Sequence, residues 1–463
     1  MHVESMNAIH ASFSRYNITS KRIIYLAFFY QLAFCGFLNT LSIFFIAQNK
    51  GLHEAFRLSL GYIGLAAFTS IFFGFLVTRI VSYRYIVAFG LLLCSGSLTA
   101  LGLIPEKYQL LGIAGLCVGT GMYVSNINII FNRQFSNNMQ RQQGQHFKYL
   151  ASNLAAIISF ITFSLMTKIW HNLSLFRYSH LFFAAAMLCG FLLFCSQYKS
   201  FQNSAEVKKQ NLLLFHLFVI VFICLISWII RQYNFVSITS CILCLFSIIY
   251  LLRQYKKYKN TGYITVLCLI FFAGLTYWIG VGVYQVVTPS LIAIDNATHI
   301  APTSIMLLNP IVVVLFGYAV IQIYKKKSPK PILKIYLGLI INLFSYLALT
   351  LALSLFNKST WVIVMFAANI ALVAVSEYLV GTTMNVYINQ FTKRSHDAIL
   401  MGMLRAFRGT AFVFAYLFFS AIEINVNNNS VASTSYKMVA SLSGLTILSL
   451  LALWTVKKFM PID

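Results

Sequence analysis

The sequence predicts an all-α polytopic membrane protein of about 14 transmembrane helices. The 463 residues are 59% hydrophobic and only 9% charged. Apolar runs of about 20 residues recur along the chain, and these are longer than a soluble core helix needs. Polar breaks at Lys199–Lys209 and Arg253–Lys259 divide the runs into six, two and six. We therefore expect an N-terminal six-helix bundle over residues 1–200, a linker with two extra helices over 201–260 and a C-terminal six-helix bundle over 261–463.

The first six spans are bounded by polar connectors. They are expected at Ile23–Ala47, Leu58–Ile80, a span ending near Ile104, Tyr108–Ile130, Phe147–Trp170 and Tyr178–Cys195. The basic, Gln-rich stretch Asn132–His146 is too polar to cross a bilayer, so we assign it to a loop. Met1–Thr19 has no short apolar core followed by a cleavage site, so no cleaved signal peptide is expected.

The next two spans, Leu212–Ile230 and Phe235–Leu252, contain almost no polar interior residue and are expected at the periphery of the molecule. The second set of six is expected at Tyr263–Thr288, Thr303–Tyr324, Ile332–Phe356, Trp361–Asn389, Ala398–Ile422 and Met438–Val456.

The formal net charge of +25 lies in the connectors rather than in one patch. Connectors on the side of the N-terminus hold about 24 Lys and Arg residues and the other side about 8, which is a strong positive-inside bias. Topology therefore explains the charge better than nucleic-acid binding does, and both termini are predicted to be cytoplasmic.

The sequence contains no motif of a soluble enzyme, neither a Gly-rich phosphate loop nor a His-Glu-x-x-His pair. We therefore predict no catalysis and no cofactor. The nine cysteines lie within apolar spans. Cys241 and Cys244 have metal-like spacing but no second pair, so all nine are interpreted as reduced packing residues and no metal is expected.

Glu377 is the one acidic residue of the nine that falls deep inside an apolar span. A carboxylate at this depth costs about 2.5–3.5 kcal/mol on insertion scales, so it normally faces a water-filled cavity or a cation. The alternative is an acid that hydrogen-bonds a neighbouring helix.

Arg405 and Arg408 are two cations inside the eleventh span of the two bundles. Their i, i+3 spacing places both on one helix face. Two interpretations are open: a water-facing patch for an anionic group, paired with Glu377, or side chains that extend along the helix to the cytoplasm.

Further polar residues inside apolar spans are candidates for a substrate cavity, because each is costly in lipid. They are Tyr30 and Gln31 in the first span, Tyr123, Asn126 and Asn128 in the fourth, Asn153 in the fifth, Gln285 in the seventh and Asn309 in the eighth. Amide side chains also link helices to one another. Asn309 precedes Pro310, so it can alternatively satisfy the carbonyl that the proline frees.

Several short polar or glycine-containing stretches follow one another along both bundles. They are Gly119–Asn126 with Asn132–Phe135, Tyr149 with Asn153, Tyr284–Asn296, Leu308–Pro310, and Ser376–Gly381 with Met401–Gly402. This set resembles the motifs of the proton-dependent oligopeptide transporter family of the major facilitator superfamily.

The resemblance implies the twelve-helix major facilitator fold with an inserted helix pair, working by alternating access. It also implies that Asn153 and Asn309 hold the backbone and terminus of a peptide, that Glu377 meets its amino group, and that Gln285 lines the same cavity.

The sequence departs from the family pattern where the family carries charge. Ala27, Tyr30 and Gln31 stand in place of charged residues of the first helix, and Val124 stands in place of a fourth-helix lysine. By this comparison, residues used for proton coupling and for holding the peptide carboxylate are missing. Arg405 and Arg408 are hypothesised to replace the lost cations.

We therefore predict a secondary transporter in the cytoplasmic (inner) membrane of a bacterium. Its partners would be a short peptide or a related zwitterionic or anionic metabolite, the lipid bilayer, and protons if transport is coupled, with Glu377 as the group that titrates. The alternatives are an uncoupled facilitator or exporter, and a membrane sensor or scaffold that translocates nothing.

Overall fold

The computed structural model describes most of the chain. The described residues are 18–48, 52–77, 80–135, 138–169, 172–201, 211–282, 307–324, 330–355, 361–387, 397–426 and 442–454.

The first half forms six long helices. They are α2 (Ile18–Ala47), α3 (Leu52–Val77), α4 (Tyr83–Leu103), α5 (Gln109–Asn132), α6 (Asn138–Ile169) and α7 (Asn172–Cys195), with short 3₁₀ turns at Glu106–Tyr108 and Tyr198–Phe201. The assignment of Asn132–His146 to a loop is wrong for most of that stretch, because α6 begins at Asn138. Gln and Arg are good helix formers, so high polarity excludes them from lipid but not from a helix.

The remaining described helices follow in the expected order. They are α8 (Leu212–Arg231), α9 (Tyr233–Tyr258), α10 (Gly262–Cys268), a π-helical segment η3 (Leu269–Leu275) that leads into helix up to Gly282, α13 (Leu308–Tyr324), α14 (Pro331–Ser354), α15 (Trp361–Tyr387), α16 (Asp397–Val426) and a last helix, Leu442–Trp454. Eleven of the described helices are long and apolar enough to cross a membrane, and Leu308–Ile323 and Leu442–Trp454 are shorter apolar helices. The predicted all-α polytopic membrane class is confirmed.

Local signals set several helix ends. The Ser82 side chain accepts a hydrogen bond from the Tyr85 backbone N–H at the start of α4, and the Asn211 side chain accepts one from the Leu214 N–H at the start of α8. Each cap satisfies one of the backbone donors that a helix start leaves unpaired. Lys259 ends α9 in the left-handed conformation, with φ of 53°.

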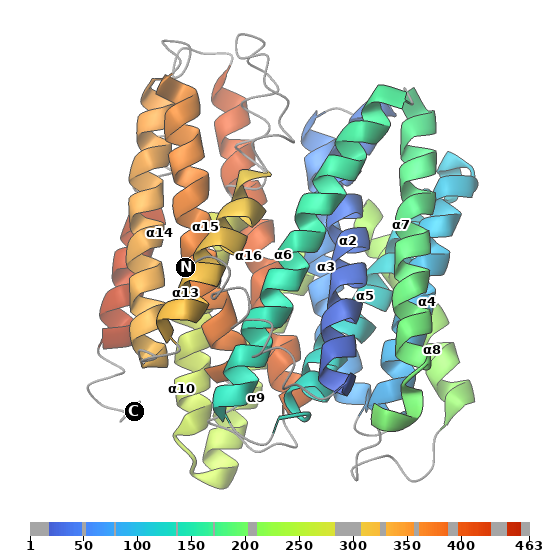
Figure 1. Cartoon of the computed structure of the whole chain (residues 1–463), viewed down its shortest axis with the longest axis horizontal. Coiled ribbons are helices and arrows are strands. Elements are labelled where there is room, and N and C mark those ends of the chain that lie inside the picture. Colours follow the sequence, from blue (N-terminus) through green and yellow to red (C-terminus); the bar gives the residue numbers. More distant parts are fainter. Residues whose placement is uncertain are drawn as a thin grey trace.

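The buried apolar residues gather into two large cores. Most helices that build the first core lie on one side of the molecule, and most of those that build the second lie on the other (Figure 1). The first core is built mainly from α2 to α8, and the second mainly from α9, α10, η3, α14, α15, α16 and the last helix. We call the end at which α6, α10 and α16 begin the basic end, because α9 reaches it with Arg253, Lys256, Lys257 and Lys259.

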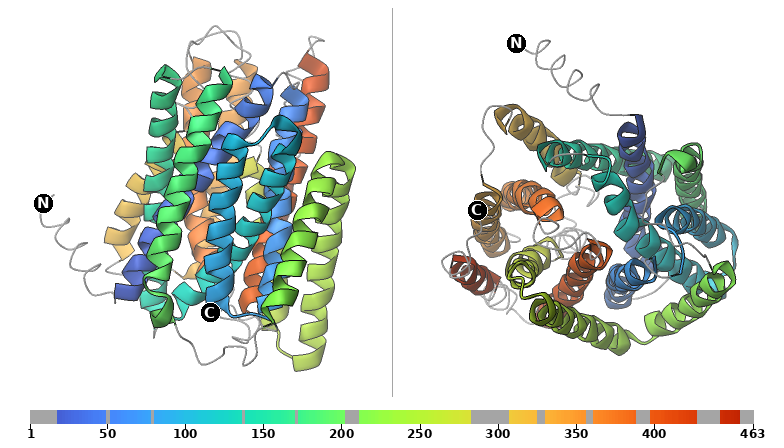
Figure 2. Two further views of the ribbon diagram at one scale, coloured as in Figure 1. Left: turned by 90° about the vertical axis from the view of Figure 1, so that its right-hand side faces the viewer. Right: turned by 90° about the horizontal axis from the view of Figure 1, so that it is seen from below.

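The inserted helices α8 and α9 lie at the outside of the molecule (Figure 2). Helix α8 packs on α5, whereas α9 packs on α16 and α3. Large apolar side chains such as Leu213, Ile220, Ile242 and Leu245 are exposed on them. These faces suit lipid contact, as the apolar sequence of the pair predicts.

The two sides meet along two helix interfaces. In the first, α3 and α16 approach closely at Gly64 and Gly409, where a Cβ atom added to Gly409 would lie 3.1 Å from the Gly64 Cα. In the second, α6 packs on α13 and α15, with Gly317 of α13 facing Leu150. Small residues allow membrane helices to pack closely. The space between these two interfaces holds the site described next.

Candidate functional site

A cavity of about 190 Å³ lies between the two sides of the molecule. Its wall is built by residues of α2, α5 and α6 from one side and of α13, α15 and α16 from the other, together with Trp278 beyond η3. Of the eleven candidate residues named from the sequence, seven line it: Gln31, Asn128, Asn153, Asn309, Glu377, Arg405 and Arg408.

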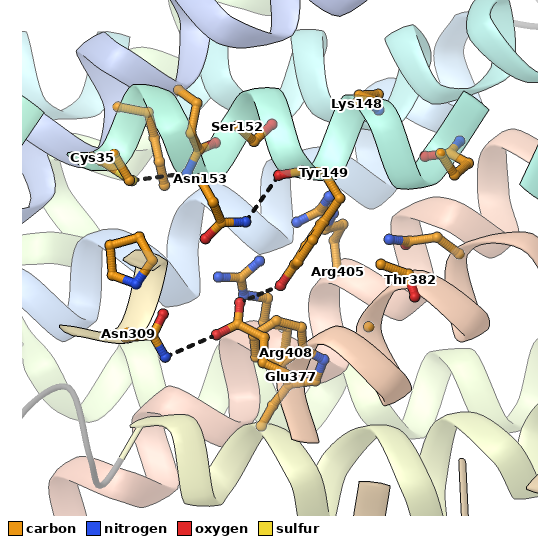
Figure 3. A pocket seen from close by; sticks show the side chains of 18 of the residues that line it. Cys35, Lys148, Tyr149, Ser152, Asn153, Asn309, Glu377, Thr382, Arg405 and Arg408 are labelled. Atoms are coloured by element: carbon orange, nitrogen blue, oxygen red, sulfur yellow. Dashed lines mark hydrogen bonds between the residues drawn. The ribbon is translucent and has the colours of Figure 1, made fainter. Parts of the chain in front are cut away.

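Glu377 of α15 is bonded to both sides of the cavity (Figure 3). The Tyr149 hydroxyl of α6 donates to its Oε1 at 2.7 Å, and the Asn309 Nδ2 of α13 donates to its Oε2 at 3.4 Å. Hydrogen bonds to an ionised carboxylate are stronger than those between neutral groups. The acid predicted to face a cavity therefore also ties α6 to α15 across the cavity.

Asn309 is positioned by the start of α13. The helix begins at Leu308, so Pro310 lies in its first turn, where a missing backbone N–H costs no hydrogen bond. Of the two roles open for the Asn309 amide, the structure shows it donating to Glu377. Thr303, the expected start of this span, lies outside the described residues.

Two further amides on the wall make bonds within their own helices. Asn153 donates to the Tyr149 backbone carbonyl at 2.9 Å, and Gln31 donates to the Cys35 sulfur at 2.8 Å. Both residues line the cavity. Such i, i+4 bonds are readily exchanged for bonds to a bound molecule.

Among the described residues that line the cavity, three are cationic and one, Glu377, carries a carboxylate. The Arg408 guanidinium lies 3.9 Å from the centre of the Trp278 ring, which is close enough for a cation–π contact. Arg405 and Arg408 both lie on the cavity wall, as their shared helix face predicts. A direct ion pair with Glu377, which belongs to one of the two interpretations left open, is not seen: within the described residues, no arginine lies within ion-pair distance of Glu377.

Lys148 of α6 is the third cation, and sequence reasoning missed it. Its ammonium donates to the Asn128 side-chain oxygen of α5 and lies 5.5 Å from the Phe131 ring centre. Lys148 is the second residue of the expected span Phe147–Trp170 and follows the basic stretch Asn132–His146, so its charge resembles that of the connector. The i, i+4 spacing of Lys148 with Ser152, and of Tyr149 with Asn153, is the signal that would have placed it on the polar face.

Tyr30 and Asn126 lie away from the cavity wall, inside a set of buried polar residues in the first core. We call this set, made of Tyr30, Tyr62, Thr120, Tyr123 and Asn126, the tyrosine seam. Tyr30 stacks on Tyr123 with ring centres 4.0 Å apart, and the Asn126 amide donates to the Met122 carbonyl at 2.8 Å. In this position the two residues pack helices together. Gln285, the remaining predicted site residue, lies outside the described residues.

The described residues bring no three His, Cys, Asp or Glu side chains together as a metal site. The described residues of the cavity wall offer hydrogen-bonding groups, aromatic rings and an excess of cationic side chains.

Comparison with known proteins gives a clear answer for the fold. No family model and no curated protein sequence matches the chain. Solved structures do match. One is a bacterial homologue of the human drug peptide transporters PepT1 and PepT2, with 13% identity over 96% of this chain and 98% of that one, at a TM-score of 0.74.

Two further structures give similar values. A POT family transporter in complex with 5-aminolevulinic acid shares 15% identity over 96% of both chains, at a TM-score of 0.74. A peptide transporter POT in complex with sulfate shares 15% identity over 95% of this chain and 94% of that one, at a TM-score of 0.73. The chain therefore has the fold of these transporters, and the predicted fold class is confirmed.

Proposed function

We propose that this chain is a secondary transporter that moves small peptides, or related zwitterionic or anionic metabolites, across the cytoplasmic membrane of a bacterium by alternating access. The observation that carries the proposal is the cavity between the two bundles, with Glu377 bonded to Tyr149 of one bundle and Asn309 of the other. A binding site at the interface of two bundles can be exposed to either face when the bundles tilt.

The bond between Tyr149 and Glu377 suggests how a proton can control that movement. The ionised carboxylate accepts the Tyr149 hydroxyl at 2.7 Å. Protonation of Glu377 removes the charge that strengthens this bond, so the link between α6 and α15 weakens. Proton binding and bundle separation are then coupled in free energy, in both directions.

One observation favours the uncoupled alternative. Glu377 is the single carboxylate among the described lining residues, and Ala27 and Tyr30 are buried in the first core in place of the charged residues of the family pattern. If Glu377 serves only to hold substrate, the protein is a facilitator that equilibrates its substrate and does not accumulate it.

The two functions are separated by reconstituting the purified protein in liposomes and measuring substrate uptake. Uptake is compared with and without a gradient that drives protons into the liposomes. We expect the gradient to drive accumulation, and Glu377→Gln to abolish accumulation while sparing counterflow exchange. The Gln side chain keeps the size of Glu and remains able to accept the Tyr149 hydroxyl, but it cannot take up a proton.

The matched control is Glu54→Gln. Glu54 is half-buried near the start of α3, where it pairs with Arg57 at 3.7 Å, and it does not line the cavity. We expect this variant to transport like the native protein. Accumulation that survives Glu377→Gln would remove Glu377 from proton coupling, and the absence of counterflow in the native protein would refute transport itself.

A further inference from the structure

We infer that the substrate carries a net negative charge and places an anionic group between Lys148 and Arg405. This inference rests on the proposed function for its biological setting, but it concerns binding and is tested separately from transport.

The first reason is the charge of the cavity wall. Among the described lining residues, Lys148, Arg405 and Arg408 are cationic and Glu377 is anionic. Positive charges held near one another in a partly desolvated site repel, because the local dielectric is far below that of water. A wall of this composition favours a ligand of opposite sign and raises its local concentration.

The second reason is the way in which these groups are paired. Glu377 already accepts from Tyr149 and Asn309, and the Arg408 guanidinium covers the Trp278 ring beside it. The Nε atom of Arg405 is buried without a hydrogen-bond partner among the described residues. Donor capacity therefore remains at Arg405, and a buried donor left unpaired is costly.

The third reason is where the groups lie along the cavity. Figure 3 shows Lys148, Arg405 and Thr382 toward the right end of the cavity and Asn153 and Asn309 toward the left end. Glu377 and Arg408 lie between these two ends. The end with Arg405 and Lys148 is the one nearer the basic end of the molecule, because α6 and α16 both begin there.

Lys148 belongs to α6 and Arg405 to α16, so a single anionic group between them contacts both bundles. A guanidinium can bind a carboxylate or phosphate through two parallel N–H bonds, and an ammonium adds a point charge. The two side chains together suit a phosphate, a phosphonate or a second carboxylate.

A zwitterion alone satisfies this wall less well. Its amino group would meet Glu377 and its carboxylate would meet one cation, which leaves the positive excess in place. A ligand with one additional negative group lowers that excess by one charge. The observations therefore favour a net anion over an ordinary dipeptide.

The test compares ligands that differ only by one negative group. Thermal stabilisation of the purified full-length protein is titrated with phosphoserine against serine, succinate against succinamate, and alanyl-glutamate against alanyl-glutamine. We expect the more acidic member of at least one pair to bind about ten times more tightly, the scale of a charge-assisted bond in a partly buried site.

Variants then locate the effect. Lys148→Gln and Arg405→Gln should each reduce the preference of that pair for its more acidic member by about tenfold, and weaken binding of the less acidic member much less. Lys334→Gln is the matched control, because Lys334 is also buried in a membrane helix but lies on α14 and does not line the cavity. It should leave the preference unchanged.

The inference is overturned if the more acidic and the less acidic member bind equally in every pair, or if no acidic member binds. It is also overturned if Lys334→Gln shifts the preference as much as Lys148→Gln does. Counterflow assays separate this outcome from the proposed function. If uncharged or zwitterionic ligands are transported and acidic ligands are not preferred, only the inference is contradicted. If acidic ligands bind tightly but show no counterflow, only the transport proposal is contradicted.

Discussion

The tyrosine seam and the cavity are both made of polar side chains inside apolar helices, yet they do different work. In the seam, Tyr30 is 5% exposed, Tyr123 is 3% exposed and Asn126 is fully buried. On the cavity wall, Tyr149, Glu377 and Arg405 are half-buried and belong to helices of both bundles. A polar residue deep in a membrane span thus marks a binding site only when its helix face looks toward the other bundle.

A glycine beside the tyrosine seam shows how closely the helices pack there. A Cβ atom added to Gly119 would lie 2.8 Å from the Gly90 carbonyl oxygen, so α4 and α5 approach almost backbone to backbone. On the cavity wall, a Cβ atom added to Gly381 would meet only the Tyr149 hydroxyl, at 4.0 Å. The first glycine closes the space between two helices, whereas the second borders open space.

The largest expected effect comes from adding a methyl group beside the tyrosine seam. Gly121→Ala would place a Cβ atom 2.7 Å from the backbone carbonyl carbon of Thr69, which cannot move aside. We expect a loss of about 3 kcal/mol, at the upper end for overpacking, seen as a clearly lower midpoint of thermal unfolding.

Gly96→Ala on the neighbouring helix α4 is its control, since nothing lies within 4 Å of the added carbon. It should be neutral or stabilise by up to about 1 kcal/mol through helix propensity. Equal midpoints for the two variants would mean that the seam is looser than the structure shows.

A smaller effect separates a tyrosine of the cavity from a tyrosine of the seam. Tyr149→Phe removes the donor to Glu377 and should cost about 1 kcal/mol, because it leaves a half-buried carboxylate with one bond fewer. Tyr123→Phe should cost nothing, since the Tyr123 hydroxyl is buried without a partner among the described residues. The two unfolding midpoints measure this difference.

Repeating Tyr149→Phe in a Glu377→Gln background sharpens the result. The tyrosine then loses a weaker partner, so the drop in the midpoint should shrink. A drop of unchanged size would show that Tyr149 stabilises the protein by packing rather than through the carboxylate.

The fold was predictable from the sequence because span length and the polar breaks depend only on local composition. Glu377, Arg405 and Arg408 were also predictable as wall residues, since charge deep in a span needs water or a partner. Asn126 and Tyr30 show the limit: an amide or phenol can be satisfied inside a helix seam, and only the facing helix decides. Lys148 shows the converse, because its place beside a basic stretch concealed its position on the wall.

The central claim is that a wet, cation-rich cavity lies between the bundles, and two native cysteines test it directly. Cys35 lines the cavity, whereas Cys117 is fully buried beside the tyrosine seam, where its thiol bonds the Tyr62 carbonyl. The measurement uses two proteins, one that keeps only Cys35 and one that keeps only Cys117. Each is labelled with anionic sulfonatoethyl methanethiosulfonate and with cationic trimethylammonioethyl methanethiosulfonate, and each rate is divided by that of the same reagent with free cysteine.

We expect Cys35 to react and Cys117 to remain unlabelled, with the normalised rate at Cys35 about tenfold faster for the anionic reagent. An unreactive Cys35, or one that prefers the cationic reagent, would contradict the account.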